Sequence, residues 1–298
     1  MIVVNYLNEF SEVKSLIYKA EYFPNGELKI KLQDLPKNSR GTVTYFIFDK
    51  NTIHDDMFIL KYLALQFGGK ITSGALFLSF LPYSRMDRED GHHGHTMPVI
   101  LRELVWLGFS DYIVTDPHNL NAVRDYSMGH LNTRFERYFP TEELIAEALE
   151  KYNIDAFQIV MPDSGAKRKY LRILESSSLP LPKVEIASGH KVRDGKTGHL
   201  VYKGIELLDC NMEYYLIVDD ICSGGMTFKL CAEAIKKANP KAKILLVVSH
   251  FEEGGGKSIL NDDAIEHIFT TDSMCNIDHP KVTQLEIFKR RKYEGTFK

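Results

Sequence analysis

The sequence predicts an α/β protein made of two similar domains, each a mostly parallel sheet flanked by helices. Apolar runs rich in β-formers alternate with amphipathic segments along the chain. The pattern restarts around Pro140, which places the expected domains at residues 1–139 and 140–298. The run from Tyr215 to Val218 is too short for a membrane helix and is typical of a strand covered on both faces.

The composition is that of an ordinary globular protein. The chain has 298 residues, 44% hydrophobic and 26% charged, and a net charge of -3, so it offers no electrostatic case for binding nucleic acid or an anionic membrane. No apolar run reaches membrane-spanning length, and the N-terminus lacks the pattern of a signal peptide. The scattered cysteines favour reduced thiols in a cytoplasmic protein: Cys210, Cys222, Cys231 and Cys275.

The first domain is expected to begin with a turn at 23–27 and an alternating strand at 28–32. Further strands are predicted at 42–49, 74–81 and 111–115, and helices at 55–67 and 98–106. Two polar segments follow strands, where ligands of open parallel sheets bind: the charged residues 82–90 and the stretch from Asp116 to Asn119. Residues His92, His93 and His95 are compatible with a metal site, but the glycines around them favour a flexible loop near the active site.

The second domain is expected to contain helices at 141–152 and 228–238 and strands at 157–161, 184–187, 215–218 and 244–250. The loop 162–166 leads to a basic helix start at 167–169, and residues 188–198 form a glycine-studded, positively charged loop. The stretch 254–258, GGGKS, resembles the end of a nucleotide-binding P-loop. Phe251 stands where that motif needs glycine, so we expect a turn there.

The clearest functional signal is the segment that follows the strand at 215–218. Two carboxylates, Asp219 and Asp220, are followed by a loop of small residues and then by a helix. Loop amides and a helix N-terminus bind phosphate, and the carboxylates can accept ribose hydroxyls or hold Mg²⁺. The predicted loop consists of Ser223, Gly224, Gly225, Met226 and Thr227.

This segment resembles the phosphoribosyl-binding motif of the type I phosphoribosyltransferases, although Met226 stands where that motif has glycine. Taken in order from Phe23 to about His250, the segments resemble the ribose-phosphate pyrophosphokinase (PRPP synthetase) family. That resemblance implies two phosphoribosyltransferase-like domains, with the ATP residues in the first and the ribose-phosphate site and a flexible catalytic loop in the second.

The resemblance also implies roles for individual residues. The ATP-binding residues would be Phe23, Asn25, Glu27, Arg85, Asp87, Arg88 and His118, with Met86 replacing a family glutamine. The Mg²⁺ site would involve His118, Asp163, Asp219 and Asp220. Lys191 and Arg193 match two of three basic residues in the family's catalytic loop. Asp219 and Asp220 would take the ribose hydroxyls, and 223–227 the 5-phosphate.

The implied reaction transfers the βγ-pyrophosphate of ATP to the 1-hydroxyl of ribose 5-phosphate. Met226 and Ser223 leave open a 5-substituted ribose, such as ADP-ribose, as the acceptor. Two further classes of protein fit part of the pattern: a non-catalytic regulatory relative and a simple phosphoribosyltransferase. The first would be expected to lose the loop lysine or the metal residues, and the second would not explain the Phe23 turn. The family's shared ATP site implies a homo-oligomer, a dimer or a hexamer.

Overall fold

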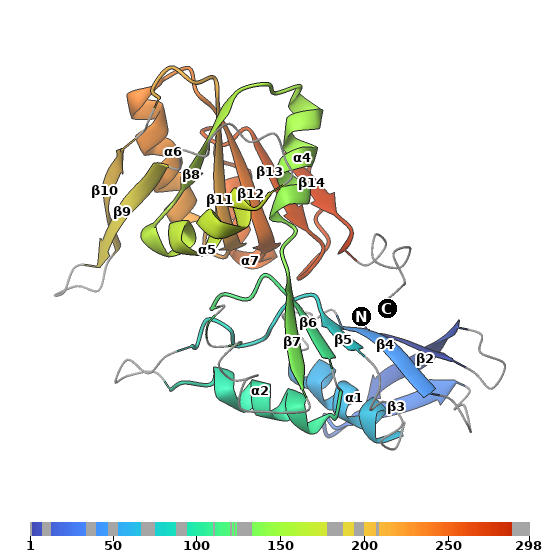
Figure 1. Ribbon diagram of the computed structural model, residues 1–298. Coiled ribbons are helices and arrows are strands. Elements are labelled where there is room, and N and C mark those ends of the chain that lie inside the picture. The colour runs from blue at the N-terminus through green and yellow to red at the C-terminus, as the bar shows by residue number, and fades with distance from the viewer. Residues whose placement is uncertain are drawn as a thin grey trace. The chain divides into compact units, whose positions relative to one another are not determined.

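The computed structural model of the chain shows two compact units, Met1–Tyr138 (unit 1) and Phe139–Lys298 (unit 2) (Figure 1). The boundary lies one residue before the expected one. The structure describes residues 2–7, 13–33, 40–46, 53–66, 75–87, 94–109, 111–119, 121, 123, 133–177, 187–193, 200–206 and 209–287. Each unit contains a seven-stranded sheet.

Unit 1 is built on a mixed sheet with the strand order β3-β2-β1-β4-β5-β6-β7. Its strands are β1 (Ile2–Leu7), β2 (Val13–Tyr22), β3 (Leu28–Gln33), β4 (Arg40–Phe46), β5 (Ala75–Leu78), β6 (Asp111–Thr115) and β7 (Arg134–Tyr138). Its helices are α1 (Ile53–Gln66) and α2 (Met97–Trp106). Strands β4 to β7 are parallel, whereas β1 is antiparallel to β2 and β4, and β3 to β2.

The predicted turn at 23–27 joins β2 and β3 into a hairpin. The Phe23 N–H donates to the Glu27 carbonyl (2.8 Å), and the Gly26 N–H donates to the Phe23 carbonyl (2.8 Å). Gly26 has φ = 86°, in the left-handed region where glycine is favoured. Strands β1 and β2, which lack an obvious turn signal between them, were not predicted.

The core of unit 1 lies between the sheet and the helices α1 and α2. Alternate residues of β5 and β6 supply the sheet's side of this core, and the two helices pack on the same face: Leu76, Leu78, Tyr112 and Val114 from the strands; Leu60, Leu63, Leu101 and Leu104 from the helices. The buried Tyr112 hydroxyl donates to the Leu104 carbonyl, which ties β6 to α2.

Unit 2 has the strand order β10-β9-β8-β11-β12-β13-β14, and every neighbouring pair is parallel except β10 with β9. Its strands are β8 (Phe157–Met161), β9 (Ala187–Arg193), β10 (Leu200–Glu206), β11 (Tyr214–Cys222), β12 (Lys243–Phe251), β13 (His267–Thr271) and β14 (Val282–Leu285). Its helices are α4 (Thr141–Tyr152), α5 (Ser164–Glu175), α6 (Met226–Ala238) and α7 (Glu253–Leu260).

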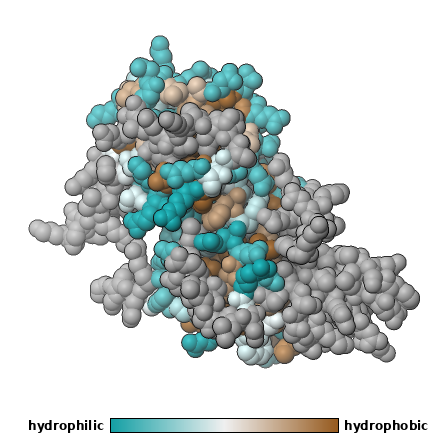
Figure 2. Space-filling view, viewed as in Figure 1, coloured by the Kyte–Doolittle hydropathy of each residue, from teal (hydrophilic) through white to brown (hydrophobic). Residues whose placement is uncertain are grey.

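Helices cover both faces of the unit 2 sheet (Figure 1). Leu216 and Val218 of β11 pack in one cluster with α4 and α5, whereas Tyr215 and Ile217 pack in the other with α6 and α7. This alternation confirms the expected strand with both faces buried. Figure 2 shows hydrophilic residues interspersed with smaller hydrophobic areas on the face in view.

Two expectations for unit 2 are wrong. Residues 188–193 were expected in a loop, but they belong to β9 because β10, which was not predicted, pairs with them. The rest of that loop, 194–198, lies outside the described residues, as do 184–186 of the predicted strand. The stretch 254–258 is not a turn but part of α7. A side chain at Gly256 would overlap the Phe251 ring, so close packing on β12 outweighs the low helix propensity of glycine.

The boundaries around the predicted sites also shift. Strand β11 extends to Cys222, so Asp219 and Asp220 lie within the strand rather than after it. Helix α6 begins at Met226, which places Met226 and Thr227 in its first turn. Helix α5 begins at Ser164, earlier than expected. No helix in the described ranges is long and apolar enough to cross a membrane.

Candidate functional site

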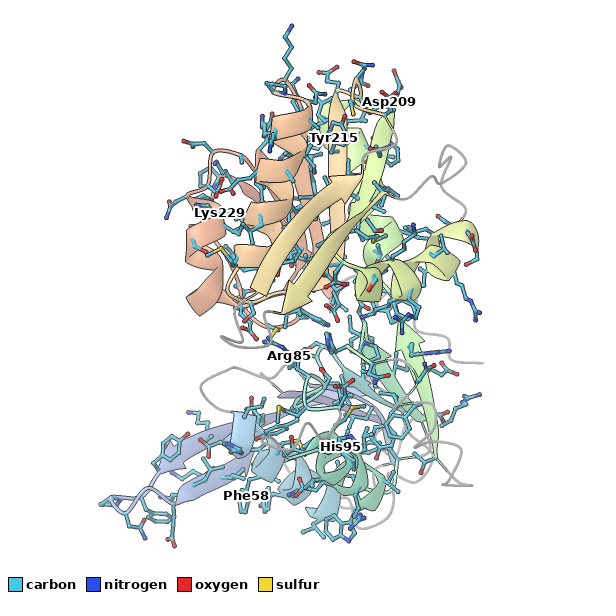
Figure 3. The ribbon with its side chains drawn as sticks, turned by 90° about the vertical axis from the view of Figure 1, so that its left-hand side faces the viewer. Phe58, Arg85, His95, Asp209, Tyr215 and Lys229 are labelled. Atoms are coloured by element: carbon cyan, nitrogen blue, oxygen red, sulfur yellow. The ribbon has the colours of Figure 1, made fainter. Side chains whose placement is uncertain are left out.

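The strongest candidate site lies at the carboxyl edge of the unit 2 sheet. Strands β8 and β11 are parallel neighbours, so the residues that end each strand meet at one edge. Asp163 follows β8, and Asp219 and Asp220 lie near the end of β11. The opposite end of β11 is closed by the Tyr215 hydroxyl, which donates to the Asp209 carbonyl at 2.7 Å (Figure 3).

The loop between β11 and α6 has the geometry of an anion site. Gly225 is the N-cap of α6, with φ = 76° and no side-chain capping bond. The first N–H groups of a helix have no partner within it, and the helix dipole favours negative charge there. Met226 follows in the first turn with 60% of its surface exposed. The predicted phosphate loop is therefore a strand-to-helix turn whose helix start carries no acidic cap.

Helix α7, which follows the neighbouring strand β12, packs against this loop. The Ser258 hydroxyl donates to the Gly224 carbonyl (3.0 Å). A side chain at Gly225 would overlap Ile259, so only glycine fits both the backbone angle and the space. These contacts with α7 fix the conformation of the loop. No pattern in the sequence had indicated that α7 contacts it.

A second contact joins the loop to the end of β12. The Ser223 hydroxyl donates to Glu252 Oε2 (2.5 Å), and the Glu252 N–H donates to the Cys222 carbonyl (2.9 Å). Sequence reasoning missed Glu252. Its place directly after a buried parallel strand was the one available signal.

The two carboxylates of β11 have different surroundings. Lys169 Nζ of α5 lies 3.1 Å from Asp220 Oδ2, and both side chains are buried. Asp219 Oδ1 accepts the N–H of Asp220 (2.8 Å). The pKa of Asp219 is raised well above its ordinary value, because burial and the negative charges of Asp220 and Asp163 outweigh the Asp220 N–H bond and the positive charge of Lys169. A carboxyl with this surrounding gains from a nearby cation.

Asp163 has a structural role that is independent of any ligand. It is the N-cap of α5, and its Oδ1 accepts the N–H groups of Gly165 (2.8 Å) and Ala166 (3.0 Å). Its charge is nevertheless close enough to raise the pKa of Asp219. The structure thus brings Asp163, Asp219 and Asp220 to one edge of unit 2, whereas His118 belongs to unit 1.

The donor set fits Mg²⁺. Within the described ranges, no three His, Cys, Asp or Glu side chains come close enough to hold a metal ion by themselves. Mg²⁺ prefers oxygen ligands, keeps several waters, and commonly takes only one or two carboxylates together with substrate phosphates. The half-buried Asp219 and its neighbours supply ligands of that kind.

In unit 1, the segments that follow β5 and β6 contact each other. Asn119 Nδ2 donates to Asp87 Oδ2 (2.6 Å), which joins the two segments, and sequence reasoning had not singled out Asn119. Tyr83 (φ = 61°) and Asp116 (φ = 36°) adopt left-handed backbone angles that are uncommon for such residues and cluster at functional sites. Arg85 (Figure 3) is exposed.

The remaining predicted residues are placed as follows. His118 is exposed after β6. Phe23, Asn25 and Glu27 lie exposed at the tip of the β2–β3 hairpin, where Asn25 Oδ1 accepts the Glu27 N–H (3.2 Å). Lys191 and Arg193 lie in β9 opposite Tyr202 and Leu200. Arg88 and the histidines at 92 and 93 lie outside the described residues, and His95 is exposed.

Comparison with known proteins places the chain beside one family. The chain is 25% identical over 286 residues to the ribose-phosphate pyrophosphokinase of Sulfurisphaera tokodaii, covering 94% of this chain and 92% of that protein. It is 24% identical over 270 residues to that of Saccharolobus solfataricus, covering 89% of this chain and 87% of that one. No model of a protein family matches the chain.

The fold is similar to that of a solved structure. The phosphoribosylpyrophosphate synthetase of Mycobacterium smegmatis superposes with a TM-score of 0.71 over 95% of this chain and 92% of its own, at 17% identity. The structural match confirms the predicted fold class of two phosphoribosyltransferase-like α/β units. Together with the sequence matches, it confirms the family resemblance.

Proposed function

We propose that this chain, a relative of the ribose-phosphate pyrophosphokinases, transfers the βγ-pyrophosphate of ATP to the 1-hydroxyl of ribose 5-phosphate. One structural observation carries the proposal. The half-buried Asp219 and the buried Asp220 lie at the same sheet edge as a glycine loop that opens α6 without an acidic cap. That combination suits a sugar that bears both free hydroxyls and a phosphate.

The sugar is proposed to lie along the loop between β11 and α6. The backbone amides at Gly225, Met226 and Thr227 would hold the 5-phosphate. Asp219 and Asp220 would accept the ribose 2- and 3-hydroxyls, since a carboxylate can take two such donors. Lys169 keeps Asp220 in a fixed orientation through their ion pair. This arrangement leaves the 1-hydroxyl free to react.

The proposed Mg²⁺ would be held at the sheet edge of unit 2 by one or two of the carboxylates of Asp219, Asp220 and Asp163, together with oxygens of the substrates. The metal role of His118, which belongs to unit 1, stays a prediction from the sequence. When bound, the ion neutralises phosphate charge and orients the phosphate groups for in-line transfer. The negative charge gathered around Asp219 is the feature of this chain that favours cation binding there.

The ATP-binding role is proposed for the segments after β5 and β6 and for the β2–β3 hairpin. Arg85, and Arg88 three positions later in the sequence, would fork onto phosphate oxygens, and the Asp87–Asn119 bond would hold the two segments in register. The exposed Phe23 tip would contact the base of ATP bound to a second copy of the chain. This arrangement implies a homo-oligomer, at least a dimer.

Lys191 and Arg193 are proposed as the catalytic pair. The 1-hydroxyl oxygen attacks the β-phosphorus, loses its proton, and AMP departs with the electrons of the broken bond. Charge therefore develops on the β-phosphate and on the leaving AMP. A lysine and an arginine brought over that centre would stabilise this charge.

A second acceptor is favoured by one observation. Met226, in the first turn of α6, exposes 60% of its surface beside the proposed phosphate position. An apolar side chain there suits a group attached beyond the 5-phosphate. The same chemistry on a 5-substituted ribose such as ADP-ribose is therefore the second candidate.

We place the reaction in the cytoplasm. None of the four cysteines, all of which lie within the described residues, forms a disulfide, and Cys210 is exposed. Cysteines kept as thiols are typical of proteins from reducing compartments.

The test is AMP release by the purified protein with ATP and Mg²⁺, offered ribose 5-phosphate and ADP-ribose separately, with phosphorus NMR of the products. A pyrophosphorylated ribose 5-phosphate is the expected product. Turnover with ADP-ribose alone would retain the mechanism and change the substrate. A protein that releases no AMP with either sugar would overturn the proposal.

A further inference from the structure

The carboxylate of Glu252 lies against the loop that is proposed to hold the 5-phosphate. Its Oε2 accepts the Ser223 hydroxyl at 2.5 Å. Glu252 reaches this position from the end of β12, and its N–H is bonded to the Cys222 carbonyl (2.9 Å). Both ends of the residue are thus tied to the loop.

This contact changes what the loop offers to a phosphate. A serine hydroxyl has one hydrogen to donate, and Ser223 gives it to Glu252. Turned this way, the hydroxyl presents only lone pairs to an incoming anion. The carboxylate adds a negative charge beside amides that would otherwise favour anions. The loop therefore combines amides that favour a phosphate with the carboxylate of Glu252, which repels it.

Resting on the proposed function, we infer that Glu252 is a specificity-determining residue that weighs against a terminal phosphate. A terminal phosphate carries close to two negative charges at neutral pH, whereas a phosphate within a diester or an anhydride chain carries one. Repulsion by Glu252 grows with that charge. Of the two candidate acceptors, Glu252 therefore weakens binding of ribose 5-phosphate more than binding of a ribose whose 5-phosphate is itself substituted.

The exposure of Met226 supports the same substrate class independently. Met226 is the first residue of α6, directly after the loop glycine Gly225, and 60% of the residue's surface is exposed. A flexible apolar side chain can pack against a substituent that extends from the phosphate. Glu252 thus disfavours a terminal 5-phosphate. Met226 offers an apolar contact to a group attached to that phosphate.

The test is direct binding, by calorimetry, of ribose 5-phosphate and of ADP-ribose to the full chain and to Glu252→Gln. Glutamine keeps the shape and an acceptor for Ser223 but removes the charge. The expected result is a gain in affinity for ribose 5-phosphate that exceeds the gain for ADP-ribose by about threefold to tenfold. Glu233→Gln, an exposed position farther along α6, makes the same change of charge and should alter neither affinity.

The outcomes separate this inference from the proposed function. Suppose that the wild-type chain binds or turns over one of the sugars. If Glu252→Gln then changes the affinities for both sugars equally, or changes neither, only the inference fails. If the wild-type chain binds neither sugar, the proposed function fails and the inference falls with it. Glu252→Ala, which also removes the charge, must shift the preference in the same direction. Ser223→Ala, which keeps the charge, must leave the preference in place.

Discussion

Lys169 Nζ lies 3.1 Å from Asp220 Oδ2, with 9% of the lysine side chain and 5% of the aspartate side chain exposed. Removing one partner of such a pair leaves a buried charge without its counterion. We expect Lys169→Met to lower the free energy of unfolding by about 3 to 5 kcal/mol, measured by urea denaturation. Lys169→Arg should recover part of the loss. An unchanged urea midpoint in Lys169→Met would show that the pair contributes little.

The two loop glycines provide a matched pair of variants. Gly225→Ala forces a side chain into the left-handed region and into Ile259, so we expect it to cost roughly 1 to 3 kcal/mol of stability. Gly224→Ala meets no atom within 4 Å and should be close to neutral in the same thermal unfolding measurement. Equal shifts in Tm for the two variants would contradict the packing argument.

The Asp87–Asn119 bond should matter for ATP rather than for the sugar. Asn119→Ala removes the contact between the segments after β5 and β6. We expect the KM for ATP to rise by roughly fivefold, the cost of about one hydrogen bond, with little change in the KM for the sugar. Asn211→Ala, at an exposed position in unit 2, is the control. A rise in the sugar KM alone would place the ATP site elsewhere.

Lys191→Ala should separate turnover from binding. If Lys191 stabilises charge that develops only in the transition state, kcat falls by a factor of roughly 100 or more while the affinity for ATP changes little. Lys237→Ala, an exposed lysine in the last turn of α6, removes the same charge without this effect. Wild-type turnover in Lys191→Ala would remove the residue from the mechanism.

His267 makes unit 2 sensitive to acid. Burial, with a smaller contribution from Lys151, lowers the pKa of His267 to about 4, from an ordinary value of 6.5. Between pH 6.5 and about 4, His267 therefore binds a proton in the unfolded chain but stays neutral in the folded chain. The contribution of neutral His267 to the free energy of unfolding is therefore fully present above pH 6.5. It is lost as the pH falls toward 4, by on the order of 2 kcal/mol. Urea unfolding of wild type and His267→Gln across this range should show a smaller pH dependence for the variant.

The sequence predicted the elements whose signals are local. Strand β11 and helix α4 follow from their hydrophobic periodicity, and the β2–β3 turn from its glycine and proline. Strand β9 and helix α7 were missed because tertiary contacts decide them. Pairing with β10 extends residues 188–193, and packing of Gly256 on Phe251 makes a helix of a glycine-rich stretch.

In the candidate site, too, the sequence showed the residues of one segment but not those that the fold brings to it. Asp219, Asp220 and the glycines belong to one continuous segment, so the sequence shows them together. Lys169 and Glu252 reach that segment from α5 and from the end of β12. Contacts between residues 29 or 51 positions apart have no signature in a single sequence, because the fold alone creates them.

The two sheets share one strand order, so β4 to β7 of unit 1 are topological equivalents of β11 to β14 of unit 2. The proposed sugar site follows β8 and β11, whereas the proposed nucleotide site follows β5 and β6, whose equivalents are β12 and β13. Strand β1, the equivalent of β8, runs in the opposite direction, so its carboxyl end lies at the other edge of its sheet. In unit 1, the strand equivalent to β8 therefore begins, rather than ends, at the edge that corresponds to the one where Asp163 follows β8. The two units thus differ by the reversal of one strand, and the proposed function assigns a different ligand to each.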